Sequence, residues 1–300
     1  SLFTRGLSLG VDFEGGRSYQ VRFDKPVEVA QVAKSLELLF VDDDGRSFAP
    51  TVKTLGSPEQ VVITTNFRIA ENGSDVEESL QSQLFAGVSS FYSENISKED
   101  FINPASDEAI GLVASRQVGP TVADDIKNTA FIAVIFSLLT IFLYLLFRFS
   151  KWQYSLGAVA ATVHDTIIVL GAYSILDGIL PFSLEVDQAF IAAILTVIGY
   201  SLNDTVVVFD RIREFFNAES KGESKHEIID NALNSTLSRT FNTSVTTILV
   251  LLIIFVFGGE VLRGFIFAIL LGVIVGTYSS LFIASPVLHD TTDDLGKKKV

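Results

Sequence analysis

Apolar residues are spread very unevenly along this chain. Before about Asp125 they occur in short stretches mixed with polar residues, and after that position they form five long stretches. An α-helix needs about 20 predominantly apolar residues to cross the hydrocarbon core of a bilayer. The pattern therefore predicts five transmembrane helices, at about Thr129–Phe147, Tyr154–Leu176, Gln188–Phe209, Thr243–Phe257 and Leu262–Leu288. The fourth stretch is the shortest, and it becomes a full span only if the polar residues from Arg239 onward are helical too.

The first 125 residues have the periodicity of a mixed α+β domain. Gly15 and Gly16 indicate a turn into a first strand, and a helical period follows over residues 27–40. Strands are predicted near residues 50–55 and 59–67, a helix near 76–91 and a last strand near 110–118. The order β-α-β-β-α-β is typical of a ferredoxin-like sandwich. The predicted fold class is a multi-span α-helical membrane protein with an α+β domain over residues 1–125, a membrane domain over 126–290 and a tail over 291–300.

The composition agrees with this division into two layers. The chain of 300 residues is 48% hydrophobic and yet has a formal net charge of −13, a combination that is rare in a single soluble domain. Acidic residues outnumber basic ones before Asp125, so charge and apolarity lie in different layers. Cysteine is absent, which excludes disulfides and thiolate metal sites. No metal or cofactor site is predicted, and Asp12 and Glu14, which lie between glycines, are expected to be solvated loop residues.

Basic residues predict the orientation of the chain. They cluster between the first and second spans, between the third and fourth, and in the tail, and these three places lie on one side of a five-span topology. Connections rich in Lys and Arg are cytoplasmic, whereas residues 177–187 carry acids and no basic residue. The α+β domain is therefore expected to be extracytoplasmic and to follow a further span upstream. The basic residues concerned are Arg148, Lys151, Arg211, Arg213, Lys221, Lys225, Arg239 and Lys297–Lys299.

Asp204 is the first candidate for a functional residue. It lies within the third predicted span, where a charged carboxylate costs about 2.5–3.5 kcal/mol even on lenient insertion scales. Such residues usually mark ion or proton pathways and have a partner. Asp165 lies in the second span, and either function or helix packing would account for it. His164 favours a packing or hydrogen-bonding role.

Arg239 is the candidate partner of an intramembrane acid. An Arg near a membrane edge can instead extend its side chain to lipid phosphate, so both interpretations are open at this stage. The hydroxyl residues between Thr240 and Thr247, and the glycines Gly272 and Gly276, are typical of close helix–helix packing.

Six segments of the sequence stand out as specific motifs: GLSLGVDFEGG (Gly6–Gly16), VGPTV (Val118–Val122), VHDTIIVLG (Val163–Gly171), IGYSLNDTVVVFDRIRE (Ile198–Glu214), LNSTLSRTFNTSVTT (Leu233–Thr247) and GGEVLRGFIFAILLGVIVGTYSS (Gly258–Ser280). Together they resemble the SecF family, which includes the SecF half of fused SecDF proteins, within the resistance-nodulation-division superfamily. The resemblance covers almost the whole chain, and the segment around Asp204 is highly specific. The first membrane helix of that family is expected just before Gly6, upstream of this sequence.

The resemblance implies a function in protein export in the bacterial inner membrane. A SecF subunit pairs with a SecD half, separate or fused upstream, and uses the proton-motive force to help unfolded preproteins leave the SecYEG channel on the outer side. Asp204 then matches the proton-carrying aspartate, Arg239 its charged partner, and Asp165 an acid of the HD motif in the same relay. The implied protein is not an enzyme, has membrane lipid but no nucleic acid as a partner, and needs no cofactor besides protons.

Two other classes of function remain open on the residues alone. A proton-coupled exporter of small molecules or lipids from the same superfamily would use the same kind of intramembrane acid, although about 120 residues outside the membrane are few for a drug-sized pocket. A passive scaffold of a channel would need no titrating acid. A measurement of proton flux separates the two proton-driven classes, the export subunit and the exporter, from the passive scaffold. Co-purification with SecYEG then separates export from efflux.

Overall fold

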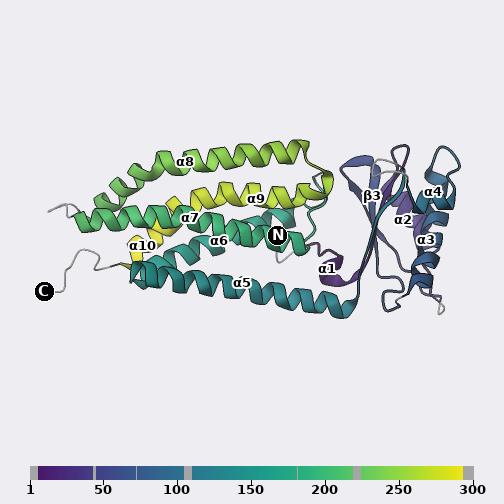
Figure 1. Ribbon diagram of the computed structural model, residues 1–300, viewed down its shortest axis with the longest axis horizontal. Coiled ribbons are helices and arrows are strands. Elements are labelled where there is room, and N and C mark those ends of the chain that lie inside the picture. Colours follow the sequence, from purple (N-terminus) through teal and green to yellow (C-terminus); the bar gives the residue numbers. More distant parts are fainter. Residues whose placement is uncertain are drawn as a thin grey trace. The chain divides into compact units, whose positions relative to one another are not determined.

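The computed structural model describes residues 6–42, 45–71, 73–104, 110–180, 182–218 and 224–292 (Figure 1). Lys221 and Lys297–Lys299, which contribute to the expected orientation, lie outside these ranges. The chain divides into two compact units. The α+β unit comprises Leu7–Thr129 and Leu176–Gln188, and the membrane unit comprises Ser1–Gly6, Ala130–Ile175 and Ala189–Val300. The short segment between the second and third membrane helices thus belongs to the α+β unit.

The α+β unit has the predicted ferredoxin-like topology. Its four strands form one sheet in the order β2-β3-β1-β4, and every neighbouring pair is antiparallel. Figure 1 shows α2 and α3 on one side of this sheet. Two short helices, α1 and α4, were not predicted. The elements are α1 (Val11–Glu14), β1 (Gly16–Arg22), α2 (Val29–Glu37), β2 (Thr51–Leu55), β3 (Ser57–Thr65), α3 (Ser74–Val88), η1 (Ser89–Phe91), α4 (Lys98–Ile102) and β4 (Gly111–Val118).

The core of the α+β unit lies between the sheet and these helices. Alternate residues of β1, Tyr19 and Val21, are fully buried, as the period of a half-buried strand requires. They pack with apolar side chains of α2 and α3 in one cluster. The two helices approach closely at Gly87, where a Cβ atom would lie 2.5 Å from Leu36 Cδ2. The helical period over residues 27–40 therefore places Val32, Leu36 and Phe40 in the core.

Arg17 is a buried cation that the sequence pattern did not reveal. Its side chain is 1% exposed and donates to Glu77 Oε2 at 2.5 Å, to Gln117 Oε1 at 2.9 Å and to the carbonyl of Glu71 at 2.9 Å. Removing one partner of a buried ion pair typically costs about 3–5 kcal/mol, because the other charge is left without compensation. Arg17, which directly follows the glycine pair, thus links β1 to α3 and to the turn before α3.

The α+β unit continues into the first membrane helix with almost no linker. β4 ends at Val118, Gly119 follows, and α5 (Pro120–Phe149) begins at the next residue. Proline is favoured at the first helical position, where its missing N–H is not needed. Val118 at the end of β4, Ala123 near the start of α5 and Val11 of α1 pack together in a small apolar cluster. The beginning of α5 is therefore part of the α+β unit.

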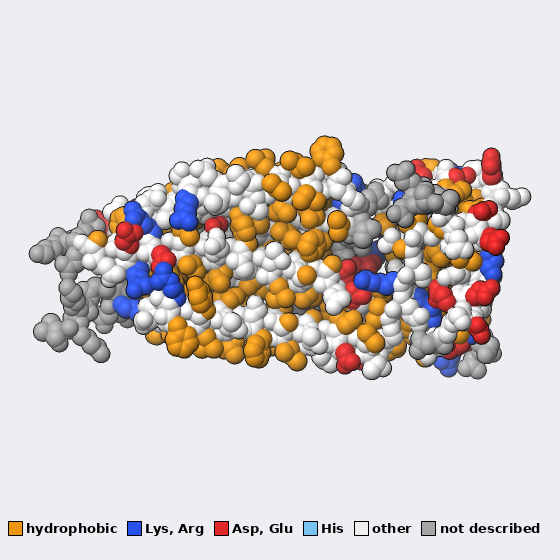
Figure 2. Space-filling view, in the orientation of Figure 1, with side chains coloured by type: hydrophobic (Ala, Val, Ile, Leu, Met, Phe, Trp, Pro, Cys, Tyr) orange, Lys and Arg blue, Asp and Glu red, His pale blue; other side chains and the backbone are white. Residues whose placement is uncertain are grey.

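In the described part of the chain, five helices are long and apolar enough to cross a bilayer. α5 extends beyond both ends of its expected span, whereas α6 ends at Leu176, α7 begins at Gln188 and α8 ends at Phe257, as expected. α8 begins at Lys225 and not near Thr243, because the polar lead-in is helical. Figure 2 shows many apolar side chains on the surface of these helices. The elements are α5, α6 (Trp152–Leu176), α7 (Gln188–Ala218), α8 (Lys225–Phe257) and α9 (Glu260–Ser279), which continues through a π-helical turn η2 (Ser280–Ala284) into α10 (Ser285–Thr291).

Charged side chains gather where α5 and α7 end. Arg148 donates to Asp210 Oδ2 at 2.8 Å, Arg211 to Glu214 Oε2 at 2.6 Å, and Arg213 to the carbonyl of Arg148 at 3.3 Å. Lys and Arg also gather at one end of the helices in Figure 2. These contacts join the C-terminal ends of two apolar helices through groups that require water or lipid headgroups around them.

Candidate functional site

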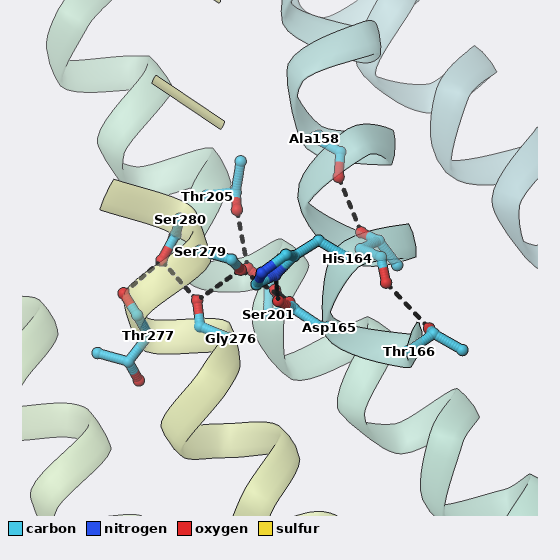
Figure 3. Close-up of polar contacts among 11 residues, drawn as sticks. Ala158, His164, Asp165, Thr166, Ser201, Thr205, Gly276, Thr277, Ser279 and Ser280 are labelled. Carbon is cyan, nitrogen blue, oxygen red and sulfur yellow. Dashed lines mark hydrogen bonds and ion pairs between the residues drawn. The ribbon is translucent and has the colours of Figure 1, made fainter. Parts of the chain in front are cut away.

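Asp165 is held by hydroxyl donors from two neighbouring helices. Its side chain, in the middle of α6, is 1% exposed. Oδ2 accepts hydrogen bonds from Ser201 Oγ of α7 at 2.6 Å and from Ser279 Oγ of α9 at 2.8 Å, and His164 Nδ1 lies 3.1 Å from Oδ1 (Figure 3). A buried carboxylate is stable only when its lone pairs are satisfied in this way. Asp165 therefore joins α6, α7 and α9 through well-formed bonds.

Asp204 is also buried but has much weaker support. Its side chain, on α7, is 5% exposed, and its one described hydrogen bond comes from Ser244 Oγ of α8 at 3.4 Å. Ser244 in turn accepts a bond of 2.7 Å from Thr277 Oγ1 of α9. Because a bond of 3.4 Å is at the limit of useful geometry, it stabilises a charge poorly. The two acids thus differ in how well their charged forms are solvated by the protein.

Glycines bring these helices into contact. A Cβ atom on Gly272 of α9 would lie 2.2 Å from Val197 Cγ2 of α7, and one on Gly276 would lie 2.9 Å from Ser201 Cβ. Small residues allow helix backbones to approach in membranes, where the hydrophobic effect does not drive association. The predicted packing role of the two glycines therefore has a chemical consequence. They bring α9, with Thr277 and Ser279, against the helix that carries Asp204.

Arg239 lies on α8 and has an exposed side chain. The one hydrogen bond described for Asp204 comes from Ser244, and among the described residues no hydrogen bond or ion pair joins Arg239 to Asp204. Arg239 is five positions before Ser244 on α8, whose hydroxyl contacts Asp204. The structure thus places the three sequence-predicted site residues in one membrane unit. Asp165 of α6 accepts bonds from α7 and α9, Asp204 of α7 accepts one from α8, and Arg239 lies on α8 without a described bond to either acid.

The hydroxyl donors are the residues that sequence reasoning missed. Ser201, Ser279 and Thr277 were not singled out, since Ser and Thr are common in packed membrane helices. One signal for the donor Ser279 was available in the sequence, namely the pair Ser279–Ser280 where α9 ends. There the helix passes into the π-helical turn η2, and such turns often occur at functional sites. No group of three or more His, Cys, Asp or Glu that could hold a metal is found in the described part of the chain.

This fold and site define a multi-span membrane protein with a ferredoxin-like domain and two carboxylates buried among its helices. The model of the family "Protein export membrane protein SecD/SecF, C-terminal" matches residues 99–294, and that of the "SecD/SecF GG Motif" matches residues 1–27. The chain belongs to the SecD/SecF family of protein-export membrane proteins.

Similar proteins agree with this assignment. The chain is 44% identical to the protein translocase subunit SecF of Rhodothermus marinus over 288 residues, which are 96% of this chain and 84% of that protein. It is 38% identical to the SecF subunit of Vibrio alginolyticus, covering 95% of this chain and 80% of that protein.

Solved structures of SecDF give the same result for the fold. The crystal structure of the translocon-associated SecDF from Thermus thermophilus matches 95% of this chain with a TM-score of 0.76 and 32% identity. A SecDF structure described as the super-membrane-facing form matches with a TM-score of 0.60 and 33% identity. The chain spans about a third of the length of these SecDF chains (34% and 35%).

Proposed function

We propose that this chain is a SecF-type subunit that uses the proton-motive force to promote preprotein translocation and release on the outer side of the SecYEG channel. It acts together with a SecD-type half, supplied as a separate chain or fused upstream. The family assignment and the similarity to SecF subunits support the role in protein export. The observation that carries the proton-driven part is the buried, weakly bonded carboxylate of Asp204.

The chemistry of Asp204 suits a proton carrier. In its neutral form the carboxyl group needs little support from its surroundings, whereas the charged form must find a cation or several donors. In this proposal the cation is Arg239 on the neighbouring helix α8, whose exposed side chain makes no described ion pair with Asp204 in this structure and would move toward the charged form. Taking up and releasing a proton therefore changes the attraction between α7 and α8. A proton that crosses 100 mV gains about 2.3 kcal/mol, which is available for moving helices.

Asp165 has a different part in this proposal. With two short hydroxyl bonds and His164 beside it, its charged form is solvated by the protein without Arg239. Ser201, which donates to Asp165, is three residues before Asp204 on α7. In this proposal Asp165 is the second acid of the relay, on the helix next to the one that carries Asp204.

The proposed orientation places the α+β unit outside the cytoplasm. Arg148 and Lys151 connect α5 to α6, and Arg211, Arg213 and Lys225 lie at the ends of α7 and α8, whereas residues 177–187 contain no basic residue. The positive-inside rule makes the basic connections cytoplasmic.

Cysteine labelling tests this orientation, and the chain offers a clean background because it has no native cysteine. A cysteine at exposed Glu71 should react with an impermeant thiol reagent added to intact spheroplasts, and one at exposed Asn217 should react only after lysis. The reverse pattern would show that the orientation is wrong.

Co-purification tests the role in export against proton-coupled efflux. The chain, expressed with its SecD-type half and solubilised in mild detergent, should retain the SecYEG channel, and proton-gradient-dependent release of a model preprotein should require both halves. A complex that never associates with the channel but moves a small hydrophobic dye against its gradient would contradict the role in export and support the exporter alternative.

A further inference from the structure

Asp12 is a buried carboxylate that the proton relay does not use. It lies in the single turn α1 and is 3% exposed, which corrects the expectation of a solvated loop residue. Its Oδ2 accepts a hydrogen bond from the backbone N–H of Gln188 at 3.1 Å, and Arg116 Nη1 of β4 lies 3.4 Å away. These contacts all lie within the α+β unit. The side chain thus links α1 and β4 to a residue far away in the sequence.

Gln188 is the first residue of α7, the helix that carries Asp204. The first N–H groups of a helix have no partner inside the helix, and a carboxylate near them is stabilised by the helix dipole. Hydrogen bonds to a charged acceptor are roughly twice as strong as those between neutral groups. Asp12 therefore acts as a cap for α7 from outside that helix.

The residues just before α7 are held against the same segment of the chain. Val186 N donates to Ser8 O at 2.8 Å and Gly10 N donates to Val186 O at 2.9 Å, which makes a short parallel bridge. A Cβ atom on Gly10 would lie 3.3 Å from Asp187 Cβ, so glycine is needed for this approach. The bridge places Asp12, two residues after Gly10, at the first N–H of α7.

Lys53 of β2 also contacts the segment between α6 and α7, in addition to Asp12 and residues 8–10. Its Nζ atom lies 3.1 Å from Glu185 Oε1 and 3.7 Å from Asp177 Oδ2, and it donates to Ser8 Oγ at 2.9 Å. Charge pairs thus bind the segment between α6 and α7 to β2, and backbone bonds bind it to residues 8–10. This segment belongs to the α+β unit, so the stretch of chain that leads from α6 into α7 is held there by contacts of its own.

We propose that Asp12 is a positioning residue that fixes the N-terminal end of α7 to the α+β unit and passes movement of α7 on to that unit. This inference rests on the proposed function of Asp204. The distance along α7 from Gln188 to Asp204 is roughly 24 Å at about 1.5 Å per residue, and a helix of this kind transmits a shift or rotation as a nearly rigid body. The segment around the glycine pair Gly15–Gly16 then has a mechanical role in export.

The test compares Asp12→Ala with Asp12→Asn and with Asp24→Ala, each in the full chain with its SecD-type half in proteoliposomes. Asp24 is a matched control, because its Oδ2 also accepts a backbone N–H, that of Ser93 at 2.8 Å, but has no contact with α7 among the described residues. In Asp12→Ala we expect export to fall at least about tenfold while proton flux stays within about twofold, because the relay is intact but uncoupled. Asp12→Asn keeps an acceptor oxygen and should retain more export, and Asp24→Ala should behave as wild type.

Amide hydrogen exchange provides a readout that does not depend on transport. The N–H of Gln188 should exchange at least about tenfold faster in Asp12→Ala, with less change in Asp12→Asn and none in β1 or β3. If Asp12→Ala does not insert into the membrane, export, proton flux and Gln188 exchange are compared between Asp12→Asn and Asp24→Ala, and a loss of export and faster exchange in Asp12→Asn alone supports the proposal. Unchanged exchange at Gln188, unchanged export, or a proportional loss of flux and export would each overturn the proposal. If Asp204→Asn also exports normally, the proposed function is wrong, and the exchange measurement alone decides whether Asp12 caps α7.

Discussion

Replacement of Asp204 by Asn should remove the proton-driven part of export and leave the folded complex intact. The amide has nearly the same size and is cheaper to bury than a charged carboxylate, so the helices around Ser244 and Thr277 keep their packing. The variant can no longer carry a proton. Since a proton crossing 100 mV provides about 2.3 kcal/mol, the loss corresponds to a factor of up to roughly 50 in export. The measurement is the rate of preprotein release into the medium from energised spheroplasts, whose outer face is exposed.

Asp210→Asn is the matched control for this variant. Asp210 is on the same helix, but it is ion-paired to Arg148 at 2.8 Å and partly exposed. The control should export within about twofold of wild type, because surface ion pairs contribute about 0–1 kcal/mol. Normal export by Asp204→Asn would show that Asp204 carries no proton. Failure of that variant to assemble would assign the carboxylate a structural role instead.

A flexible insertion of about ten Gly and Ser residues after Gly119 should uncouple export from proton movement. β4 and α5 are separated by Gly119 alone, and Val118, Ala123 and Val11 pack around the junction. A shift of α5 is therefore transmitted directly to the sheet. A Gly/Ser linker of ten residues behaves as a random coil with ends roughly 17 Å apart on average, and it dissipates such a shift. Proton flux should stay within about twofold of wild type while release falls about tenfold.

The same insertion after Gly45 is the control. Gly45 lies in an exposed turn between α2 and β2, where added residues are tolerated. Export at the wild-type level from the Gly119 insertion would mean that rigid transmission through β4 and α5 is wrong. The contacts of Asp12 and Lys53 with the segment between α6 and α7 would then be the next candidates for transmission.

The order of elements in the α+β unit could be predicted because each element has a local signal. The two-residue period of β1 and the apolar face of α2 depend only on neighbouring residues, and the β-α-β-β-α-β order limits the sheet to few topologies. The burial of Arg17 and Asp12 had no such signal. Their partners, Glu77 and Gln188, are far away in the sequence, and glycines around Asp12 favoured an exposed loop.

The two candidate acids stand out in the sequence, whereas the hydroxyl groups that donate to Asp165 do not. A carboxylate in an apolar span is conspicuous because burying it is costly. Which hydroxyl groups reach it depends on the rotation and separation of three helices, and these are set by contacts such as Gly272 with Val197. Ser201 and Ser279 are ordinary residues in the sequence and become donors to Asp165 only through that packing.

The central claim, that protons move through Asp204 to drive export, is tested most directly by proton flux in proteoliposomes. Liposomes would contain the chain with its SecD-type half and a pH-sensitive dye, with a membrane potential imposed in the absence of preprotein. We predict that the wild type and Asp210→Asn acidify the lumen at similar rates and that Asp204→Asn acidifies it no faster than protein-free liposomes. Equal flux through Asp204→Asn and the wild type would contradict the account.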